Sequence, residues 1–342
     1  MPPPQPPMPE GHGPSTRLRD LGLRIDDTQL QPIIDEFRRE LDRTGICRVK
    51  PHFYLSTEWG VPFDTVAIAI PFYLARPDLT QMHAERAGFV EGVGRADILR
   101  YLRHEMGHVV NYAYKLYDEP EWVKHFGSIT QPYEEEYRPV PFSRRFVRHL
   151  PGFYAQKHPD EDWAETFAVW MTPGRNWRAE YAGWPTALAK LEYCDRRMKE
   201  LGDQPPLVED IELDEDVGAL STTLEEYYGH PTAEVAMPPG LDGALQAIFE
   251  DVGAPEGGTS DAPRKSAAEL IHRLRNELAA VVFRWTGHFP ERTRPLLAYL
   301  AKRAEELHQV YPADREERVV IALTSLVTAL AMNHVVRGSY FA

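Results

Sequence analysis

Cysteine is almost absent from this chain of 342 residues, which contains only Cys47 and Cys194. Two cysteines exclude a disulfide framework and a thiolate metal cluster, so a bound metal would need histidine and carboxylate ligands. Excess positive charge is absent too, because 38 lysines and arginines face 52 aspartates and glutamates, giving a formal net charge of −14. An acidic chain repels phosphate backbones, so we expect no nucleic-acid partner.

Long hydrophobic runs are also missing. The N-terminal stretch MPPPQPPMPEGHGPST lacks the apolar segment of a secretory signal. The most apolar segment, residues 319–332, is interrupted by Thr324, Ser325 and Thr328 and is short for a membrane span, which favours a buried helix. We therefore expect a cytoplasmic protein without a membrane partner.

Changes in composition divide the chain into four parts. Residues 1–16 are proline-rich and predict a disordered tail, and residues 17–203 have the pattern of a globular domain. Residues 204–265 combine an acidic stretch with a Gly- and Pro-rich one, which predicts a linker region with helical segments. Residues 266–342 predict three helices, near 266–285, 292–310 and 314–337. We expect an all-α bundle that regulates access to a site, binds a protein partner or self-associates.

The domain at residues 17–203 mixes helical and strand patterns. Apolar residues at helical spacing predict helices at 27–43, 96–116, 159–171 and 184–201, whereas residues 48–56 and 65–74 are β-rich. Pro71 cannot donate to a strand ladder, so the second strand should lie at an edge or end there. That strand either binds an extended peptide or is a plain core strand. The fold class predicted is α+β, with a small mixed sheet followed by helices.

The chemistry of the chain centres on the segment His104-Glu105-Met106-Gly107-His108, which matches H-E-x-x-H. Histidines four residues apart share one face of a helix, so both can reach one metal ion. Glu105 lies beside them, where a carboxylate can act as general base toward a water molecule activated by Zn²⁺. The pattern predicts a catalytic zinc site with one ion per chain.

A catalytic zinc site needs a third protein ligand. A glycine and a third histidine just downstream are absent, since Asn111 and Tyr114 occupy those positions. Glu161 and Glu165 are the best candidates, because they share one face of an otherwise apolar predicted helix. One would coordinate zinc and the other would accept a hydrogen bond from a ligand histidine. His158 is the remaining alternative, as third ligand or as a contribution to substrate binding.

HEMGH followed by YAQKHPDEDWAETFA resembles the gluzincin clan of zincin-like metallopeptidases, and most closely a bacterial family of zinc-binding metallopeptidases. The resemblance spans about Leu21 to Leu201 and extends more remotely to the catalytic domain of anthrax lethal factor. It implies a zincin-like domain with an active-site helix and a second helix that carries a ligand. It also implies Glu161 as the zinc ligand, Glu165 as the partner of a ligand histidine and Tyr154 as a catalytic donor to the oxyanion.

These observations predict a zinc metallopeptidase, an endopeptidase that hydrolyses a protein or peptide substrate. The alternatives are a non-catalytic, zinc-stabilised protein-interaction module and an effector or toxin protease. A structural zinc site has no use for a base such as Glu105, so that residue favours catalysis.

Overall fold

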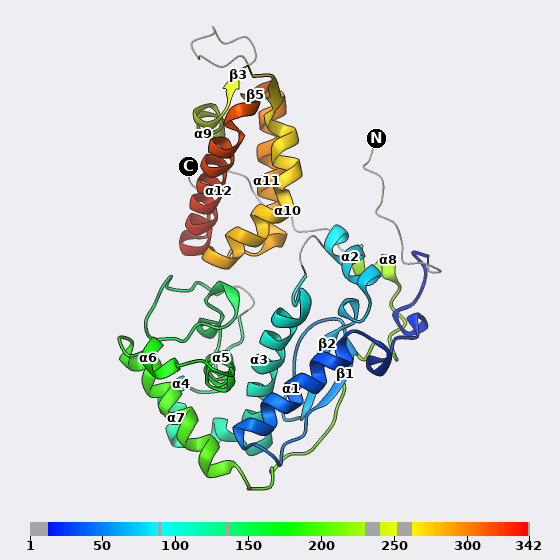
Figure 1. The fold of residues 1–342 in the computed structure, drawn as a ribbon, viewed down its shortest axis with the longest axis vertical. Coiled ribbons are helices and arrows are strands. Elements are labelled where there is room, and N and C mark those ends of the chain that lie inside the picture. The colour runs from blue at the N-terminus through cyan, green and yellow to red at the C-terminus, as the bar shows by residue number, and fades with distance from the viewer. Residues whose placement is uncertain (1–12, 88–89, 135–136, 230–239, 252–261, 341–342) are drawn as a thin grey trace. The chain divides into compact units, whose positions relative to one another are not determined.

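The computed structural model describes residues 13–87, 90–134, 137–229, 240–251 and 262–340, and the chain divides into two units, residues 1–230 and 231–342. Most of the predicted tail at residues 1–16 lies outside the described residues, as do parts of the predicted linker. Both units are mostly helical with small sheets, so the fold is α+β (Figure 1).

Helices make up most of the first unit, and the order of its elements is as follows. They are η1 (Leu18–Leu21), η2 (Ile25–Asp27), α1 (Leu30–Thr44), β1 (His52–Ser56), β2 (Ala67–Pro71), η3 (Phe72–Leu74), α2 (Pro77–Arg86), α3 (Gly94–Tyr114), η4 (Leu116–Asp118), α4 (Pro120–Phe126), η5 (Pro151–Gln156), α5 (Pro159–Met171), α6 (Trp177–Glu180), α7 (Pro185–Leu201) and α8 (Leu224–Tyr228). The η elements are single 3₁₀ turns or short 3₁₀ segments.

The sheet of the first unit is small. Strands β1 and β2 pair in parallel, and α1 and α3 run beside them (Figure 1). Every residue of β2 is buried, and Pro71 is its last residue, where a missing N–H costs no ladder bond. On its other side, β2 meets Gly60 in an antiparallel bridge, with the Ala69 amide donating to the Gly60 carbonyl at 2.8 Å. Because β1 covers one side of β2 and Gly60 covers the other, segment 59–61 forms the edge of the sheet on the Gly60 side.

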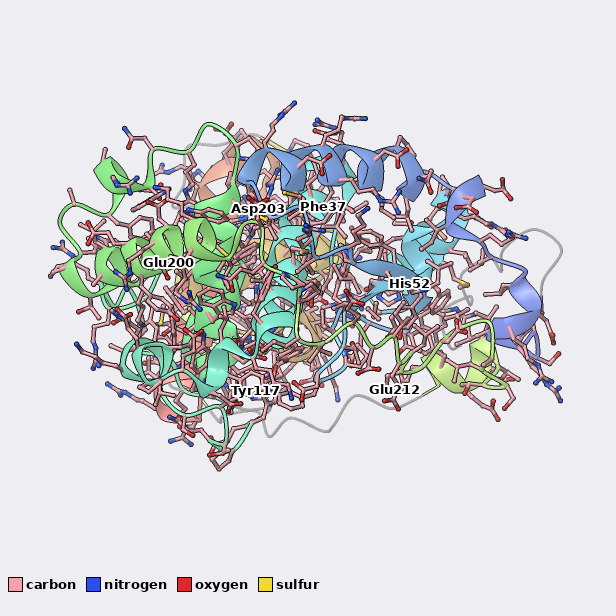
Figure 2. All side chains as sticks on the ribbon, turned by 90° about the horizontal axis from the view of Figure 1, so that it is seen from below. Phe37, His52, Tyr117, Glu200, Asp203 and Glu212 are labelled. Atoms are coloured by element: carbon pink, nitrogen blue, oxygen red, sulfur yellow. The ribbon has the colours of Figure 1, made fainter. Side chains whose placement is uncertain are left out.

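Apolar burial fixes α1 against the rest of the unit. Leu30, Ile34 and Phe37 lie on one face of α1 and are fully buried. Phe37, labelled in Figure 2, packs edge to face on Phe53 of β1, with 6.1 Å between ring centroids. This is the amphipathic pattern on which the helix was predicted.

A close crossing of α3 and α5 forms the centre of the first unit. A Cβ at Gly107 would lie 2.6 Å from the Cα of Ala164, so only glycine allows the two backbones to approach this closely. The indole N–H of Trp163 donates to the Gly107 carbonyl at 2.8 Å. The glycine of HEMGH therefore brings α5 against the two histidines of α3.

The stretch after α7 packs within the first unit, although the sequence predicted a linker from residue 204. Figure 2 shows this stretch running from Asp203 to Glu212 across the unit. Its backbone binds the folded body at three places: Leu207 donates to Ala113, Asp210 accepts from Val66 and Val217 donates to Leu55. The division between the two units falls after His230.

The second unit contains four helices and three short strands among its described residues: α9 (Leu241–Ile248), β3 (Glu250–Asp251), β4 (Arg264–Ser266), α10 (Ala267–Thr286), α11 (Pro290–Glu306), β5 (Gln309–Pro312), the turn η6 (Ala313–Arg315) and α12 (Glu316–Arg337). The last three helices lie close to their predicted ranges. The antiparallel sheet β3-β5-β4 differs from the all-α region expected, because strands of two to four residues leave no alternating pattern in the sequence.

Helix α12 is more exposed than the buried helix expected from its sequence. Residues 313–337 have the length and composition of a membrane span, and 28% of their most apolar 18-residue window is buried in the protein. Leu323, Val327 and Leu330 form the buried face, while Ile321 on another face is 67% exposed. A core helix of a soluble protein passes the same test of length and composition.

Candidate metal centre and active site

Helix α3 places two imidazoles side by side. His104 and His108 lie one helical turn apart, and their Nε2 atoms are 3.2 Å from each other. Both side chains are buried, and their ring centroids lie 5.0 Å apart. The local cause is the four-residue spacing, which stacks the two side chains on one face of the helix.

Helix α5 brings a carboxylate to the same point. The Oε2 atom of Glu161 lies 3.0 Å from Nε2 of His104 and 3.3 Å from Nε2 of His108. One ligand atom from each of the three residues lies within 4.8 Å of the other two. Two imidazole nitrogens and one carboxylate oxygen form the donor set of a catalytic zinc site, so these residues fit that metal.

His104 is oriented by Glu165. The Nδ1 atom of His104 lies 3.0 Å from Oε1 of Glu165, whose oxygens also accept from the backbone amides of His149 and Leu150. Burial by itself would lower the pKa of His104, but hydrogen bonds to Glu161 and Glu165 outweigh it and raise that pKa to about 9. A carboxylate held in this way fixes the ring orientation of a ligand histidine.

His108 is oriented by Asp160, a residue that the sequence analysis did not single out. Nδ1 of His108 lies 2.9 Å from Oδ2 of Asp160, and the side chains of Asn111 and Tyr112 donate to the same carboxylate at 2.6 and 2.5 Å. Burial opposes ionisation of Asp160, yet His108 lowers the pKa of that carboxyl. The available signal was an aspartate directly before Glu161, but acidic residues are common in a first helical turn.

Glu105 has a different environment from the other carboxylates. It is buried, and it lines the same cavity as the two histidines. Burial raises the pKa of Glu105, although the charges of His104 and His108 act in the opposite direction. By contrast, burial of Glu161 is outweighed by His108 and His104, which hold its pKa well below the usual range. Glu105 therefore takes up a proton more readily than Glu161 does.

The cavity above these residues has a volume of about 310 Å³. Segment 59–63 forms one wall and follows α3, because Trp59 stacks on Tyr101 at 5.2 Å and Phe63 packs on Tyr112 at 5.0 Å, measured between ring centroids. Tyr133, Tyr154 and Ile129 line it from the irregular region after α4. The cavity is therefore open to a ligand above the metal-binding atoms and has largely aromatic walls.

Tyr154 lies beside the metal-binding residues, and its role as donor to the oxyanion stays a prediction. Its ring centroid is 5.6 Å from that of His104, and it lines the cavity. The preceding residues Gly152 and Phe153 both have positive φ, at 84° and 59°, which turns the short segment η5 toward the site. Burial raises the pKa of Tyr154 well above its usual value, so its hydroxyl keeps its proton at neutral pH and can donate.

His158 uses both ring nitrogens in structural hydrogen bonds. Its Nδ1 accepts from the Asp160 amide at 3.2 Å, capping α5, and its Nε2 lies 3.0 Å from the Gln131 carbonyl. The ligand atoms that converge on one point belong to His104, His108 and Glu161, and His158 lines the cavity beside them. His158 thus anchors residue 131 and the start of α5.

Tyr133 was also missed. Its hydroxyl donates to Oε1 of Glu161 at 2.7 Å and lies 3.4 Å from the hydroxyl of Tyr154. Nothing in the sequence singles it out, because it lies in an irregular region and the chain contains 16 tyrosines.

These features define a class of site. An H-E-x-x-H helix, a glutamate from a second helix and a buried carboxylate beside an open cavity form a zincin-type candidate metal centre. Residues 72–174 match the model of a protein family described as "Putative zinc-binding metallo-peptidase", a range that contains α3, η5 and α5. The match supports the resemblance to zinc-binding metallopeptidases over residues 72–174, and the assignment to the gluzincin clan stays a prediction.

No curated protein and no solved structure matched the chain in the other two comparisons. The remote similarity to anthrax lethal factor stays a prediction.

Proposed function

We propose that the chain is a zinc-dependent endopeptidase that cleaves a protein or peptide substrate. One observation carries this proposal: His104, His108 and Glu161 converge in a buried position, and Glu105 lines the same open cavity. Bound there, Zn²⁺ would lower the pKa of a water molecule to about 7 and polarise a carbonyl group.

The side chains around the metal position have separate roles in the proposed reaction. Glu105 accepts the proton of the attacking water and passes it to the amine that leaves, a role suited to its raised pKa. Tyr154 donates a hydrogen bond to the oxyanion that develops on the scissile carbonyl. Glu165 and Asp160 hold the two histidines so that both Nε2 atoms face the position where Zn²⁺ would bind.

The outer edge at segment 59–61 is the place where an extended substrate would pair. The sequence left open whether the strand at residues 65–75 binds the substrate, but β2 is covered by β1 on one side and by Gly60 on the other. Segment 59–61 lines the cavity, and Gly60 already uses its carbonyl toward β2. In an extended segment the backbone groups of successive residues alternate in direction, so those of Trp59 and Val61 would face away from β2 and be available to a substrate.

Replacing Glu105 by glutamine tests the proposal. We expect wild type and Glu105→Gln to contain one zinc per chain, because residue 105 is not a ligand, whereas hydrolysis of peptides should fall by about 10²–10⁴-fold. Glu85→Gln, an exposed change on α2, serves as the matched control with unchanged activity. Comparing new N-termini in cells that carry wild type and Glu105→Gln would then identify the substrate.

A non-catalytic zinc module predicts a different result in the same experiment. In that case, wild type and Glu105→Gln would bind zinc equally and neither would produce new N-termini. That result would reject the peptidase proposal.

A further inference from the structure

The two oxygens of Glu161 face different partners. Oε2 lies 3.0 and 3.3 Å from the Nε2 atoms of His104 and His108, whereas Oε1 accepts a hydrogen bond from the Tyr133 hydroxyl at 2.7 Å. A carboxylate can coordinate a metal ion through one oxygen or through both. Here the phenol of Tyr133, a residue outside both α3 and α5, donates a hydrogen bond to one of the two oxygens.

Several contacts hold Tyr133 over the start of α5. The Nζ atom of Lys157 lies 4.3 Å from the Tyr133 ring centroid, and the His158 ring lies 5.3 Å away. The neighbouring Gln131 is fastened through its carbonyl to Nε2 of His158. Tyr133 remains 48% exposed, so it sits at the rim of the cavity with only its hydroxyl directed inward.

We propose that Tyr133 is a positioning residue that reserves Oε1 of Glu161, so that the glutamate gives the metal one oxygen only. A catalytic zinc site combines three protein ligands with one open position for water or substrate. If Glu161 offered both oxygens, the second would compete for that position. The inference rests on the metal centre of the proposed function and adds a residue that controls its open coordination position.

The geometry favours this role over a second donor to the oxyanion. Tyr133 lies 2.7 Å from the carboxylate and 3.4 Å from the Tyr154 hydroxyl, so the carboxylate is its nearer partner. Tyr154 packs on the ring of His104, with 5.6 Å between ring centroids, and is less exposed than Tyr133, which suits it to the reacting carbonyl. The two phenols thus differ in target although they share one side of the cavity.

Cobalt substitution of the full chain provides the test, because the visible absorption of Co²⁺ weakens as its coordination number rises above four. We expect wild type and Tyr133→Phe each to bind one cobalt, with weaker absorption in the variant. In the zinc form, kcat should fall by about 10–100-fold with little change in KM. Tyr137→Phe is the matched control from the same region, because its hydroxyl bonds the Gly152 carbonyl instead of the ligand, so the cobalt spectrum should not change.

Three other outcomes are distinguishable. Identical cobalt spectra and equal kcat for wild type and Tyr133→Phe would overturn the role of Tyr133 and leave the peptidase proposal standing. Failure of the wild-type chain to bind zinc or cobalt would reject the metal centre itself. A change of equal size in Tyr137→Phe would assign the effect to loop structure and also overturn the role.

Discussion

Four buried carboxylates surround two imidazoles at the candidate metal centre, and their environments separate their roles. Asp160 and Glu161 are held ionised by the histidines, and Glu165 is bound by two backbone amides and His104. Burial raises the pKa of Glu105 instead. Carboxylates whose pKa values are pushed apart in this way are typical of sites that separate structural anions from a general base.

Asp160→Asn should weaken zinc binding by about 10–100-fold, because His108 would lose the charged acceptor that fixes its ring. The amide is almost isosteric, so the fold should persist. Competition with a chromophoric chelator measures the affinity. Asp35→Asn, at a half-exposed side chain on α1, is the control and should bind zinc as wild type does. Equal zinc affinity in Asp160→Asn and wild type would show that the negative charge of residue 160 is not needed to orient His108.

The sequence predicted which side chains share one face of a helix. The spacing of His104 and His108, and of Glu161 and Glu165, follows from the period of a helix. Tyr133 could not be found in this way, because its contact with Glu161 depends on an irregular segment with no period. Asp160 was visible as an acidic residue, but only the crossing of α3 and α5 reveals that it faces His108.

The crossing of α3 and α5 is the element-scale feature on which the site depends. Ligands come from both helices, so a shift of one helix against the other changes every distance at the metal position. The crossing is set by Gly107, where a methyl group would meet the backbone of Ala164.

Gly107→Ala should lower the free energy of unfolding by about 1–3 kcal/mol, because the contact leaves no room for a methyl group. This cost exceeds the ~1 kcal/mol that alanine normally gains over glycine in a helix. Urea denaturation measures the change, and zinc affinity should fall with it. Gly243→Ala on α9 is the control, since no atom lies within 4 Å of the point that its Cβ would occupy and the change should be neutral or stabilising. Full stability of Gly107→Ala would show that the crossing tolerates a wider spacing.

Long helices were predictable at this scale, and short strands were not. Helix α5 begins and ends at the residues predicted, Pro159 and Met171, because proline fits the first turn and the apolar face is continuous. The cover over β2 was not predictable, since it consists of one antiparallel bridge at Gly60. A single bridge depends on tertiary packing and leaves no alternating pattern.

At the scale of the whole molecule, the chain consists of two units with separate cores. The acidic composition of residues 204–216 predicted a linker, yet backbone hydrogen bonds join this stretch to the first unit. Side-chain composition gives no information on backbone hydrogen bonds, which explains why the predicted linker belongs to the first unit. The family match falls entirely within the first unit, so the role predicted for the C-terminal helices stays a prediction.

The second unit should lose stability in acid through His288. Burial lowers the pKa of this residue to about 3, with smaller contributions from His334 and Arg292, and its ring nitrogens lie 2.7 Å from the Thr293 hydroxyl and 2.9 Å from that of Tyr340. A lowered pKa in the folded state means that the unfolded chain binds more protons, so stability falls as pH drops from about 6.5 toward 3. At pH 5 the loss relative to pH 7 is about 2 kcal/mol.

Thermal unfolding at pH 7 and pH 5 measures this effect. His288→Gln should lose less stability between these two pH values than wild type does, whatever its stability at pH 7. His272→Gln, an exposed change on α10, should follow wild type. Parallel pH dependence in wild type and His288→Gln would contradict the assignment.

The bridge between Gly60 and Ala69 also determines how long a stretch of substrate can lie along the rim of the cavity. It fixes segment 59–63 so that Trp59 stacks on Tyr101 and Phe63 packs on Tyr112, two residues that are eleven positions or about 16 Å apart along α3. An extended peptide advances about 3.3 Å per residue, so about five residues would lie along this rim at once. Under the proposed function, dipeptides and tripeptides would leave much of the rim without a partner, and the enzyme would favour the interior of longer chains.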